Sequence, residues 1–545
     1  MAFINYKDKS FLVVDDFESF RLSLKKMLDN FGVSKVDTAI NGRDAVLACN
    51  KQDYNVILCD YNLGSGKNGQ QVLDELRYTR RLKNTSLFLL ITAEATKDMV
   101  LGALEHQPDA YLTKPLTQSM LKNRLDRLME EHYQVLPIKK ALDQNDIKQA
   151  IIECQKVLSQ DSRSHKWCIR KLAELYYQNK NYDEAEQVCL KQLEERKLDW
   201  PYLTLGKVAA ARKNYPQALE YFTELLAINP QYVNCYDEIA ATYLAIGDST
   251  KAQQAIMTGV QISPRSVHRQ LKLAEISRQN DDLDTATQAY RNTVELGKNS
   301  IHDAIDNHLN FARCLSDNAE HDYSKEGKLQ AKEALNILEQ VNKKYKDDPK
   351  LMLQSAMISS RVHAGQNNDE GAEKALNSAL KAMENMGDGV NPSIQLEMAK
   401  TLFANNRTED AEKLLKQIIA DNPDNQDLID QANALLDEPV SIKNRIKAAA
   451  INLEAITAYE QQDFTTAIEK FTEALKFSSR HPGLNLNLIQ AYLKQMSDAG
   501  LDKKTLDQCQ TYLNNVNHIH ASHPQFERYE ALKSKIASLR QKLSA

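Results

Sequence analysis

Small residues recur at a fixed step through most of this chain. Pairs of alanine or glycine twelve residues apart begin at positions 173, 206, 240, 274, 399 and 455, and four successive second members lie 33 or 34 residues apart: Ala185, Ala218, Ala252 and Ala286. Two helices of about 14 residues and their turns fill such a period, and small residues let the paired helices approach closely. The pattern therefore predicts an all-α solenoid of helical hairpins after Pro137.

The predicted array is not uniform along the chain. Between 298 and 390 the helix periodicity continues with wider spacing, which indicates long-helix repeats rather than loops. A further helix, around 428–436 or 442–450, separates two later repeats, and the last segment is typical of a capping hairpin. The expected domains after a first one at 1–130 are repeats at 131–297, long-helix repeats at 298–390, repeats with a spacer helix at 391–500, and capping helices at 501–545.

The first 130 residues follow another pattern, in which short apolar runs alternate with amphipathic segments. Strands are expected near 10–14, 35–39, 56–59, 87–91 and 109–113, with helices over 17–31, 44–51, 70–80, 97–106 and 116–130. Five such units make a doubly wound α/β domain with a five-stranded parallel sheet. A switch between the first and third strands gives the strand order 2-1-3-4-5.

Chemically reactive side chains end or follow four of the predicted strands. They are Asp15 and Asp16 after the first strand, Asp60 at the third, Thr92 at the fourth and Lys114 at the fifth. The carboxyl ends of parallel strands share one edge, where ligands bind at the switch point, so these groups are expected to meet. Carboxylates, a hydroxyl and an ammonium at one spot are what acyl-phosphate chemistry at an aspartate requires.

The three aspartates also predict a metal site. Asp15, Asp16 and Asp60 crowd negative charges together, which a bound divalent cation makes tolerable. An all-oxygen set suits Mg²⁺, and the backbone carbonyl of Asn62 is a candidate further ligand. The Lys114-Pro115 bond is a candidate cis peptide, since a tight turn here would aim the lysine into the site.

Residues 10–130 resemble the receiver domain of two-component response regulators, and the resemblance rests on the strings LVVDDFESFR, VILCDYNL, LLITAE and DAYLTKPL. It implies a flavodoxin-like fold and phosphorylation by a sensor histidine kinase. The roles it implies are Asp60 as phosphoacceptor, Asp15 and Asp16 as Mg²⁺ ligands, Thr92 and Lys114 as phosphoryl contacts, and Tyr111 as an aromatic switch that turns inward when Thr92 moves. One departure is the loop 64–68, which is about one residue longer than usual.

Two polar side chains beside the acceptor bear on how long a phosphoryl group would last. Asn62 and Glu94 can hydrogen-bond an attacking water, and the same pair occurs in the rapidly self-dephosphorylating chemotaxis receiver. The resemblance implies a short-lived mark, and the alternative is that both are solvated loop residues. Apart from this phosphorylation and self-dephosphorylation, no enzymatic activity is expected, because the sequence holds no Walker loop, HExxH or other catalytic motif.

The later repeats match the tetratricopeptide (TPR) pattern, most fully at 199–232. Such arrays bind proteins on a concave face, which we expect the first helix of each repeat to line. First helices beginning at 166, 199, 233 and 267 place these candidate groove residues inward: Trp167, Arg170, Tyr177, Trp200, Lys207, Asp237 and Leu271. Aromatic side chains beside basic ones make a plausible hot spot. The alternative is a helical phase shifted by two residues, which would place both tryptophans in the core.

Charge and hydropathy exclude several other classes of protein. A net charge of -5 with scattered basic residues argues against nucleic-acid binding. The sequence has no apolar stretch of about 18 residues and no apolar signal segment at its start, so neither membrane insertion nor export is expected. Eight cysteines without metal-ligand spacing predict reduced, buried thiols and a cytoplasmic protein.

The sequence thus favours a response regulator whose output is protein binding by the repeats. The expected partners are a sensor histidine kinase and an unidentified protein in the TPR groove, and a homodimer is left open. The alternative is a phosphate sink or inhibitor, in which the repeats hold the kinase and the receiver limits phosphotransfer to another regulator. The two differ in whether phosphorylation changes the affinity for a downstream protein.

Overall fold

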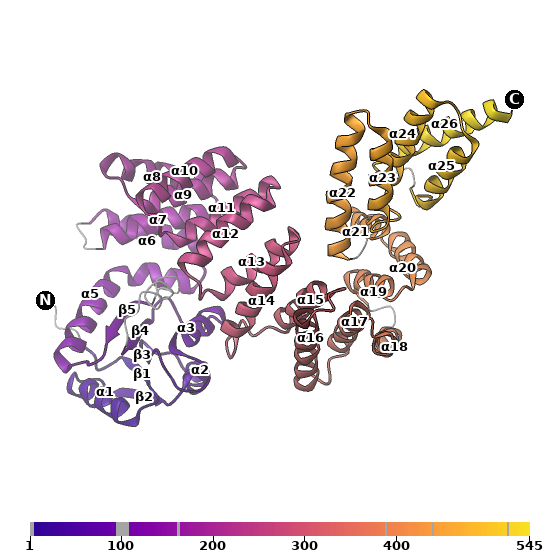
Figure 1. Cartoon of the computed structure of the whole chain (residues 1–545). Helices are drawn as coiled ribbons and strands as arrows, with labels where there is room; N and C mark the ends of the chain where they lie inside the picture. The colour runs from indigo at the N-terminus through magenta and orange to yellow at the C-terminus, as the bar shows by residue number, and fades with distance from the viewer. Residues whose placement is uncertain are drawn as a thin grey trace. The chain divides into compact units, whose positions relative to one another are not determined.

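The computed structural model describes residues 5–93, 108–160, 164–386, 390–438, 441–519 and 523–544. The chain forms two compact units (Figure 1). The first comprises Met1–Asn280 and Gln288–Asn307, and the second comprises Asp281–Thr287 and His308–Ala545. The helix predicted over 97–106 and the side chain of Glu94 lie outside the described residues.

A five-stranded parallel sheet opens the first unit. Its strands are β1 (Ser10–Val14), β2 (Lys35–Ala39), β3 (Val56–Asp60), β4 (Leu87–Thr92) and β5 (Ala110–Thr113). They lie in the order β2-β1-β3-β4-β5, and every pair in that order is parallel. The predicted sheet, strand order and strand positions are therefore confirmed.

Alternate residues of each strand face opposite sides of the sheet and fill two separate cores. One core joins Phe11, Val13 and Leu58 to leucines of α1 (Glu18–Asn30) and α5 (Gln118–Asp143). The other joins Leu12 and Val14 to α2 (Gly42–Lys51) and α3 (Gly69–Tyr78). Figure 1 shows these two pairs of helices on opposite sides of the sheet. Both faces are buried, which explains why the strands read as continuous apolar runs.

Helix α5 is longer than the sequence indicated, and the prediction that it ends at residue 130 is wrong. It runs unbroken to Asp143 with Pro137 inside it. A proline inside a helix removes one backbone hydrogen bond. The second half of α5 nevertheless stays helical, because Val135, Ile138 and Ala141 are buried against α6 (Ile147–Leu158) and α7 (His165–Gln178).

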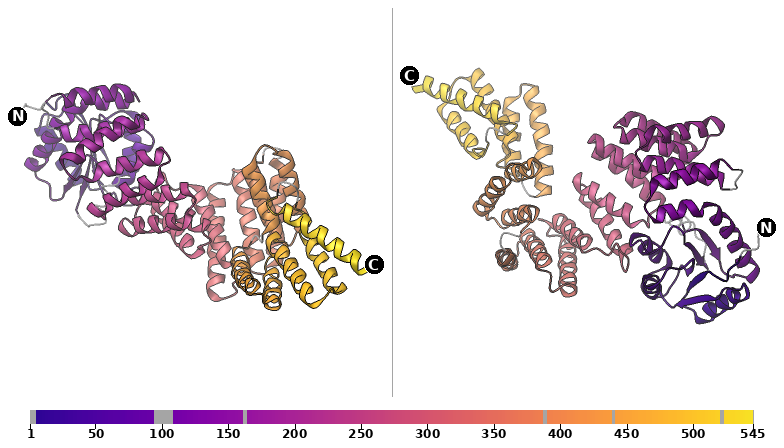
Figure 2. Two further views of the ribbon diagram at one scale, coloured as in Figure 1. Left: turned by 90° about the horizontal axis from the view of Figure 1, so that it is seen from above. Right: turned by 180° about the vertical axis from the view of Figure 1, so that it is seen from behind.

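Paired helices follow α5 and stack as hairpins, which are visible in both views of Figure 2. The remaining helices of this part are α8 (Tyr182–Glu195), α9 (Asp199–Ala211), α10 (Tyr215–Ile228), α11 (Val233–Ile246), α12 (Ser249–Ile262), α13 (Val267–Gln279) and α14 (Leu283–Gly297). The first helices α7, α9, α11 and α13 begin at 165, 199, 233 and 267, within one residue of the predicted starts.

The recurring small residues lie where the two helices of a hairpin meet. Ala173, Ala185, Ala218 and Ala252 are fully buried. At Gly206 in α9, a Cβ atom would lie 2.3 Å from the ring of Phe222 in α10, so a larger residue would push the two helices apart. The small residues that recur twelve positions apart are thus the points where the two helices of a hairpin pack closely.

The second unit is helical throughout its described residues. Its helices are α15 (Ile305–Ala319), α16 (Lys325–Lys344), α17 (Pro349–Gly365), α18 (Asp369–Met386), α19 (Pro392–Ala404), α20 (Thr408–Asp421), α21 (Gln426–Asp437), α22 (Ile442–Glu460), α23 (Phe464–Leu475), α24 (Pro482–Ala499), α25 (Lys503–Asn515) and α26 (Phe526–Ser544). Helices α16, α17 and α18 have 20, 17 and 18 residues, as the wider spacing predicted. Both proposed positions for the spacer are helical, since α21 covers one and α22 the other.

Two further expectations can be compared with the structure. All eight cysteines are unpaired and buried, as predicted. Within the residues that the structure describes, no helix combines the length and the apolar character needed to cross a membrane.

Candidate functional site

The carboxyl edge of the sheet brings the predicted reactive side chains together. Asp15 follows β1, Asp60 ends β3 and Thr92 ends β4, and all three side chains are buried. Lys114 follows β5, and its backbone N–H donates to the Thr92 carbonyl at 2.8 Å. This bond fixes the turn after β5 beside the end of β4, so that the lysine enters the same site as the acidic residues.

Carboxylate oxygens form a compact set at this edge. One oxygen each from Asp15, Asp16 and Asp60 lies within 4.8 Å of the others, with Asp16 exposed and its two neighbours buried. Three hard oxygen donors, one of them open to solvent, suit Mg²⁺ with water completing its shell. The three predicted aspartate ligands are thus brought together, and the chemistry of their donors fits the ion. For Asn62 the structure shows an exposed side chain two residues beyond Asp60.

Lys114 is the cation of the site. Its Nζ lies 2.8 Å from Oδ2 of Asp15 and 3.2 Å from Oδ2 of Asp60. The same ammonium sits 4.1 Å from the centre of the Phe20 ring, a contact that the sequence analysis missed. The Lys114-Pro115 peptide bond is cis, as expected. The ammonium therefore spans the acceptor and one acidic neighbour.

Burial and charge set the ionisation of these groups. Burial, opposed by the ammonium of Lys114 and reinforced by the negative charge of Asp15, raises the pKa of Asp60 to about 6. Burial tends to lower the pKa of Lys114, but its hydrogen bond to Asp15 and the charges of Asp60 and Asp15 outweigh this and raise it. At neutral pH the site thus combines an ionised acceptor with a charged lysine.

The loop after Asp60 returns close to the acceptor. The N–H of Gly69 donates to the Tyr61 carbonyl at 2.9 Å, and a Cβ at Gly69 would lie 2.2 Å from the Asp60 carbonyl oxygen, so only glycine fits. Asn68 and Gln71 then cap α3 reciprocally. The segment that contains loop 64–68 thus begins and ends beside the acceptor.

Tyr111 on β5 packs partly buried against the core formed with α2 and α3. Its hydroxyl is buried and has no hydrogen-bond partner among the described residues. Burial, with the nearby Tyr61, raises the pKa of this phenol well above its ordinary value. Among the described residues the ring is therefore held by packing, without a hydrogen bond at its hydroxyl.

Three of the predicted groove positions contact a side chain of a neighbouring first helix. The Nζ of Lys207 in α9 sits 4.9 Å from the ring centre of Tyr177 in α7 and 3.5 Å from a carboxylate oxygen of Glu238 in α11. Asp237 of α11 then forms a two-bond ion pair with Arg269 of α13, at 2.6 and 2.8 Å. Arg170 pairs with Glu174 on its own helix, α7, at 3.3 Å.

The two tryptophans, expected at equivalent positions, have different surroundings. Trp200 packs partly buried against the cluster of Ala173, Cys189 and Leu205. Trp167 is 40% exposed and lines a cavity of about 960 Å³ beside α5, together with Lys139 and other residues of the sheet domain and α7. The structure therefore does not join them in one surface. Sequence reasoning also missed Glu238, which lies in the next first helix, 31 residues after Lys207.

The fold and this edge of the sheet define a receiver-type signalling domain joined to a repeat array. A family model described as response regulator receiver domain matches residues 11–126, and one described as tetratricopeptide repeat matches 141–205 and 370–436. Chemotaxis protein CheY-3 of Vibrio cholerae is 32% identical over 130 residues, which cover 24% of this chain and 98% of that protein. The chain belongs to the response regulator receiver family through its N-terminal domain, and tetratricopeptide repeats follow.

Two further similarities accompany this assignment. Chemotaxis protein CheY of Pseudomonas aeruginosa is 29% identical over 119 residues, which cover 22% of this chain and 94% of that protein. The solved C-terminal part of a TPR repeat-containing protein from Cytophaga hutchinsonii is 14% identical, covers 49% of this chain and 99% of its own, and has a TM-score of 0.36.

Proposed function

We propose that this protein is a response regulator that a histidine kinase phosphorylates on Asp60, and that its output is protein binding by the repeats. The observation that carries the proposal is the position of the Lys114 ammonium, 2.8 Å from Asp15 and 3.2 Å from Asp60 at the carboxyl edge of the sheet. A lysine shared between the acceptor and an acidic neighbour balances charge before a phosphoryl group arrives.

The chemistry follows from these positions. A carboxylate oxygen of Asp60 attacks the phosphorus of a phosphohistidine, an O–P bond forms, the N–P bond breaks, and the electron pair stays with the histidine nitrogen. When bound by Asp15, Asp16, Asp60 and the Asn62 carbonyl, Mg²⁺ supplies charge neutralisation for the phosphoryl oxygens. Positioning and electrostatics then do most of the work, as in phosphoryl transfer generally.

Two residues of the site bind the transferred group after the reaction. The Lys114 ammonium exchanges its contact with Asp60 for one with a phosphoryl oxygen, and the Thr92 hydroxyl moves to another. Tyr111 follows the movement of Thr92, since its hydroxyl has no hydrogen-bond partner to break among the described residues. This movement of Thr92 and Tyr111 would shift the helices that pack beside β5, which include α5.

The repeats supply the output surface, and the groove is proposed at Tyr177, Lys207 and Arg170, with Trp167 at its edge. Lys207 is held between an aromatic face and a carboxylate, so its ammonium is positioned before any partner binds. Preordered groups lose less entropy on binding. We place this activity in the cytoplasm and assign the chain no catalysis beyond its own phosphorylation and dephosphorylation.

Acceptor identity is tested with acetyl phosphate and Mg²⁺, followed by intact-mass measurement. We expect a single added phosphoryl group, lost in Asp60→Ala and retained in Asp53→Ala, an exposed carboxylate just before the opposite end of β3. Full labelling of Asp60→Ala would refute the assignment of the acceptor. Omitting Mg²⁺ should also suppress labelling, because the acidic residues would lose their counterion. Replacing Asp15 and Asp16 by Asn should do the same, because Mg²⁺ would lose two carboxylate ligands.

A further inference from the structure

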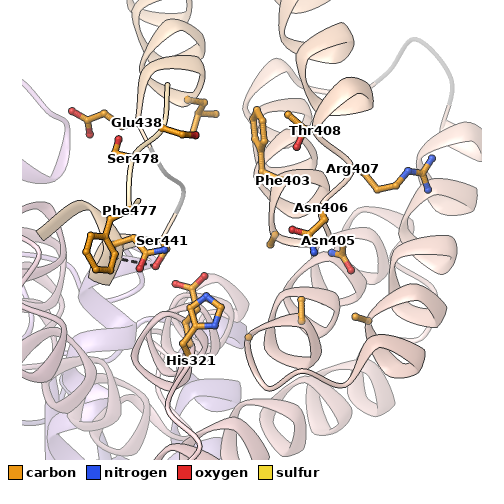
Figure 3. A pocket seen from close by; sticks show the side chains of 18 of the residues that line it. His321, Phe403, Asn405, Asn406, Arg407, Thr408, Glu438, Ser441, Phe477 and Ser478 are labelled. Atoms are coloured by element: carbon orange, nitrogen blue, oxygen red, sulfur yellow. Dashed lines mark hydrogen bonds between the residues drawn. The ribbon is translucent and has the colours of Figure 1, made fainter. Parts of the chain in front are cut away.

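The second unit contains a cavity of about 740 Å³ that the proposed receiver chemistry does not use. Its walls come from residues at the turns that join α15 to α16, α17 to α18, α19 to α20, α21 to α22 and α23 to α24. Figure 3 shows His321 below it, Asn405, Asn406 and Arg407 on one wall, and Phe477 and Ser478 on the other. Residues far apart in sequence thus converge on one space in the repeats.

The lining of this cavity is acidic in effect. Its two arginines are already paired with carboxylates of α20, Arg407 with Asp410 at 2.6 Å and Arg480 with Glu412. Three of its carboxylates, Glu320, Asp369 and Glu373, have no side-chain partner among the described residues.

The remaining acidic lining residues are balanced from within the unit. Asp437 accepts hydrogen bonds from His518 and His523 at 2.7 and 2.9 Å. Glu438 lies 3.8 Å from Arg445. The uncompensated charge of the cavity is therefore negative, and it complements a cation.

Two aromatic rings add an apolar element. Phe403 and Phe477 stand on opposite walls of the cavity (Figure 3), and both are only partly buried. Each ring packs with part of its surface against a hydrophobic cluster of its own wall, and the Nζ of Lys447 lies 5.6 Å from the centre of the Phe477 ring. Each ring thus offers an apolar surface to a side chain that enters the cavity from its side.

A buried, unpaired hydroxyl marks the same wall. Ser478 is 4% exposed and lines the cavity, and its Oγ has no hydrogen-bond partner among the described residues. A buried polar atom without a partner is costly, so a ligand that reaches it gains a bond that the free protein lacks. The carboxamides of Asn406 and Asn444 in the same lining can both donate to and accept from a peptide backbone.

We propose that this cavity binds an extended, basic segment of a partner protein. Lys or Arg side chains of the segment pair with Glu320, Asp369 and Glu373, and an apolar side chain packs against Phe403 or Phe477. Its backbone bonds to Ser478 and the neighbouring carboxamides. This inference rests on the proposed protein-binding output of the repeats and specifies the chemistry of one partner segment.

The test uses the full-length chain and a displayed library of random heptapeptides, selected against wild type and against the triple variant Glu320→Gln, Asp369→Asn, Glu373→Gln. We expect wild type to enrich peptides that combine Lys or Arg with a large apolar residue, and the triple variant to lose them. The best peptide, measured by fluorescence anisotropy, should bind the triple variant at least tenfold more weakly and weaken with added salt.

A matched control is the triple variant Glu326→Gln, Glu370→Gln, Glu384→Gln, which removes the same charge from exposed positions of α16 and α18 outside the cavity. It should bind like wild type, and Ser478→Ala should bind more weakly while keeping its melting temperature. Enrichment of acidic or uncharged peptides, no enrichment at all, or equal losses in both triple variants would overturn the proposal. Labelling of Asp60, and the effect of beryllium fluoride on the proteins that the immobilised chain retains, are measured separately, so failure of the proposed function is distinguished from failure of this site.

Discussion

We predict that single residues at the edge of the receiver site set how long a phosphoryl group on Asp60 lasts. Asn62 is exposed beside the buried acceptor, where it can orient an attacking water. We expect the phosphoryl group on Asp60 to be lost within minutes, and Asn62→Val to slow that loss severalfold, because one water contact disappears.

Phosphate release after rapid removal of acetyl phosphate measures both rates. Ser65→Ala, an exposed change in the same loop, is the control and should decay like wild type. A wild-type half-life of hours would contradict the role proposed for Asn62 and its predicted companion Glu94.

His132 in α5 predicts a pH-dependent stability. Burial, with the charges of Lys139 and Lys9, lowers the pKa of His132 from 6.5 to about 4 in the folded chain. Between those values the unfolded state binds more protons than the folded state, so stability falls as the pH drops from 6.5 towards 4. The expected loss at pH 5 is about 2 kcal/mol relative to neutral pH.

Urea unfolding of the first unit's signal at pH 7 and pH 5 measures this effect. His132→Gln should remove most of the pH-dependent difference, whereas His165→Gln, at an exposed histidine, should leave it unchanged. An identical pH dependence in wild type and His132→Gln would show that other groups carry the effect.

The sequence predicted the positions of residues that end or follow a strand. It did not predict contacts between neighbouring repeats. Asp60, Thr92 and Lys114 end or follow apolar runs, and strand ends meet at one edge in any parallel sheet of this kind. The burial of Trp200 and the pairing of Lys207 with Glu238 depend on the rotation between neighbouring repeats. A single helical period does not encode that rotation.

At the scale of elements, α5 belongs to two cores. Leu121 and Leu125 pack under the sheet, while Ile138 and Ala141 pack against α6 and α7. Near its end, Asp143 accepts four hydrogen bonds from the backbone and side chains of Asn84 and Thr85, just before β4. A helix shared in this way transmits a displacement without a flexible joint.

We therefore predict that a phosphoryl mimic changes hydrogen exchange across 116–150. Beryllium fluoride with Mg²⁺ should alter protection in α5 and α6, because a shift at Thr92 and Tyr111 moves a helix that both cores hold. Asp60→Ala should abolish the change, and Asp143→Ala should reduce the part that reaches α6. Unchanged exchange over this range would mean that the receiver and the repeats are only tethered.

The packing of helix pairs separates the two tryptophans. Trp200→Ala should lower the free energy of unfolding by about 2 kcal/mol, because its ring fills space against Ala173, Cys189 and Leu205. Trp167→Ala should change it by less than about 0.5 kcal/mol, since the side chain is 40% exposed and lines a cavity instead of a packed cluster. Chemical denaturation of both variants measures the difference. Equal losses of unfolding free energy would show that the two tryptophans are packed equally well, against the prediction.

Helix starts were predictable to within a residue in the first repeats, and the end of α5 was not. Recurring alanines fix where two helices touch, and that distance sets the period. The continuation of α5 past Pro137 arises because Val135 and Ile138 are buried by α6 and α7, which lie later in the sequence. A proline is therefore a poor predictor of a helix end when helices later in the sequence bury the residues before and after it.

At the scale of the whole molecule, the two units are each held by their own contacts. In the second unit, Arg361 bonds to Asp317 and lies 3.4 Å from Glu397, which Arg313 contacts at 3.0 Å, so that buried charges join α15, α17 and α19. Removing one member of such a set leaves another charge buried without its partner, which makes the arrangement costly to change. The network therefore fixes α15, α17 and α19 relative to one another within the second unit.

The last prediction separates a response regulator with a protein-binding output from a phosphate sink. Proteins retained by the immobilised chain are quantified by mass spectrometry with and without beryllium fluoride, using Asp60→Ala as the control. For an output protein we expect the mimic to change affinity roughly fivefold or more, the lower range of allosteric coupling, and Asp60→Ala to abolish that change. A sink would instead retain its kinase equally in both conditions and slow phosphotransfer from that kinase to a second regulator. That result would replace the proposed output by inhibition, while the acceptor chemistry at Asp60 would stand, because both modes load the same carboxylate.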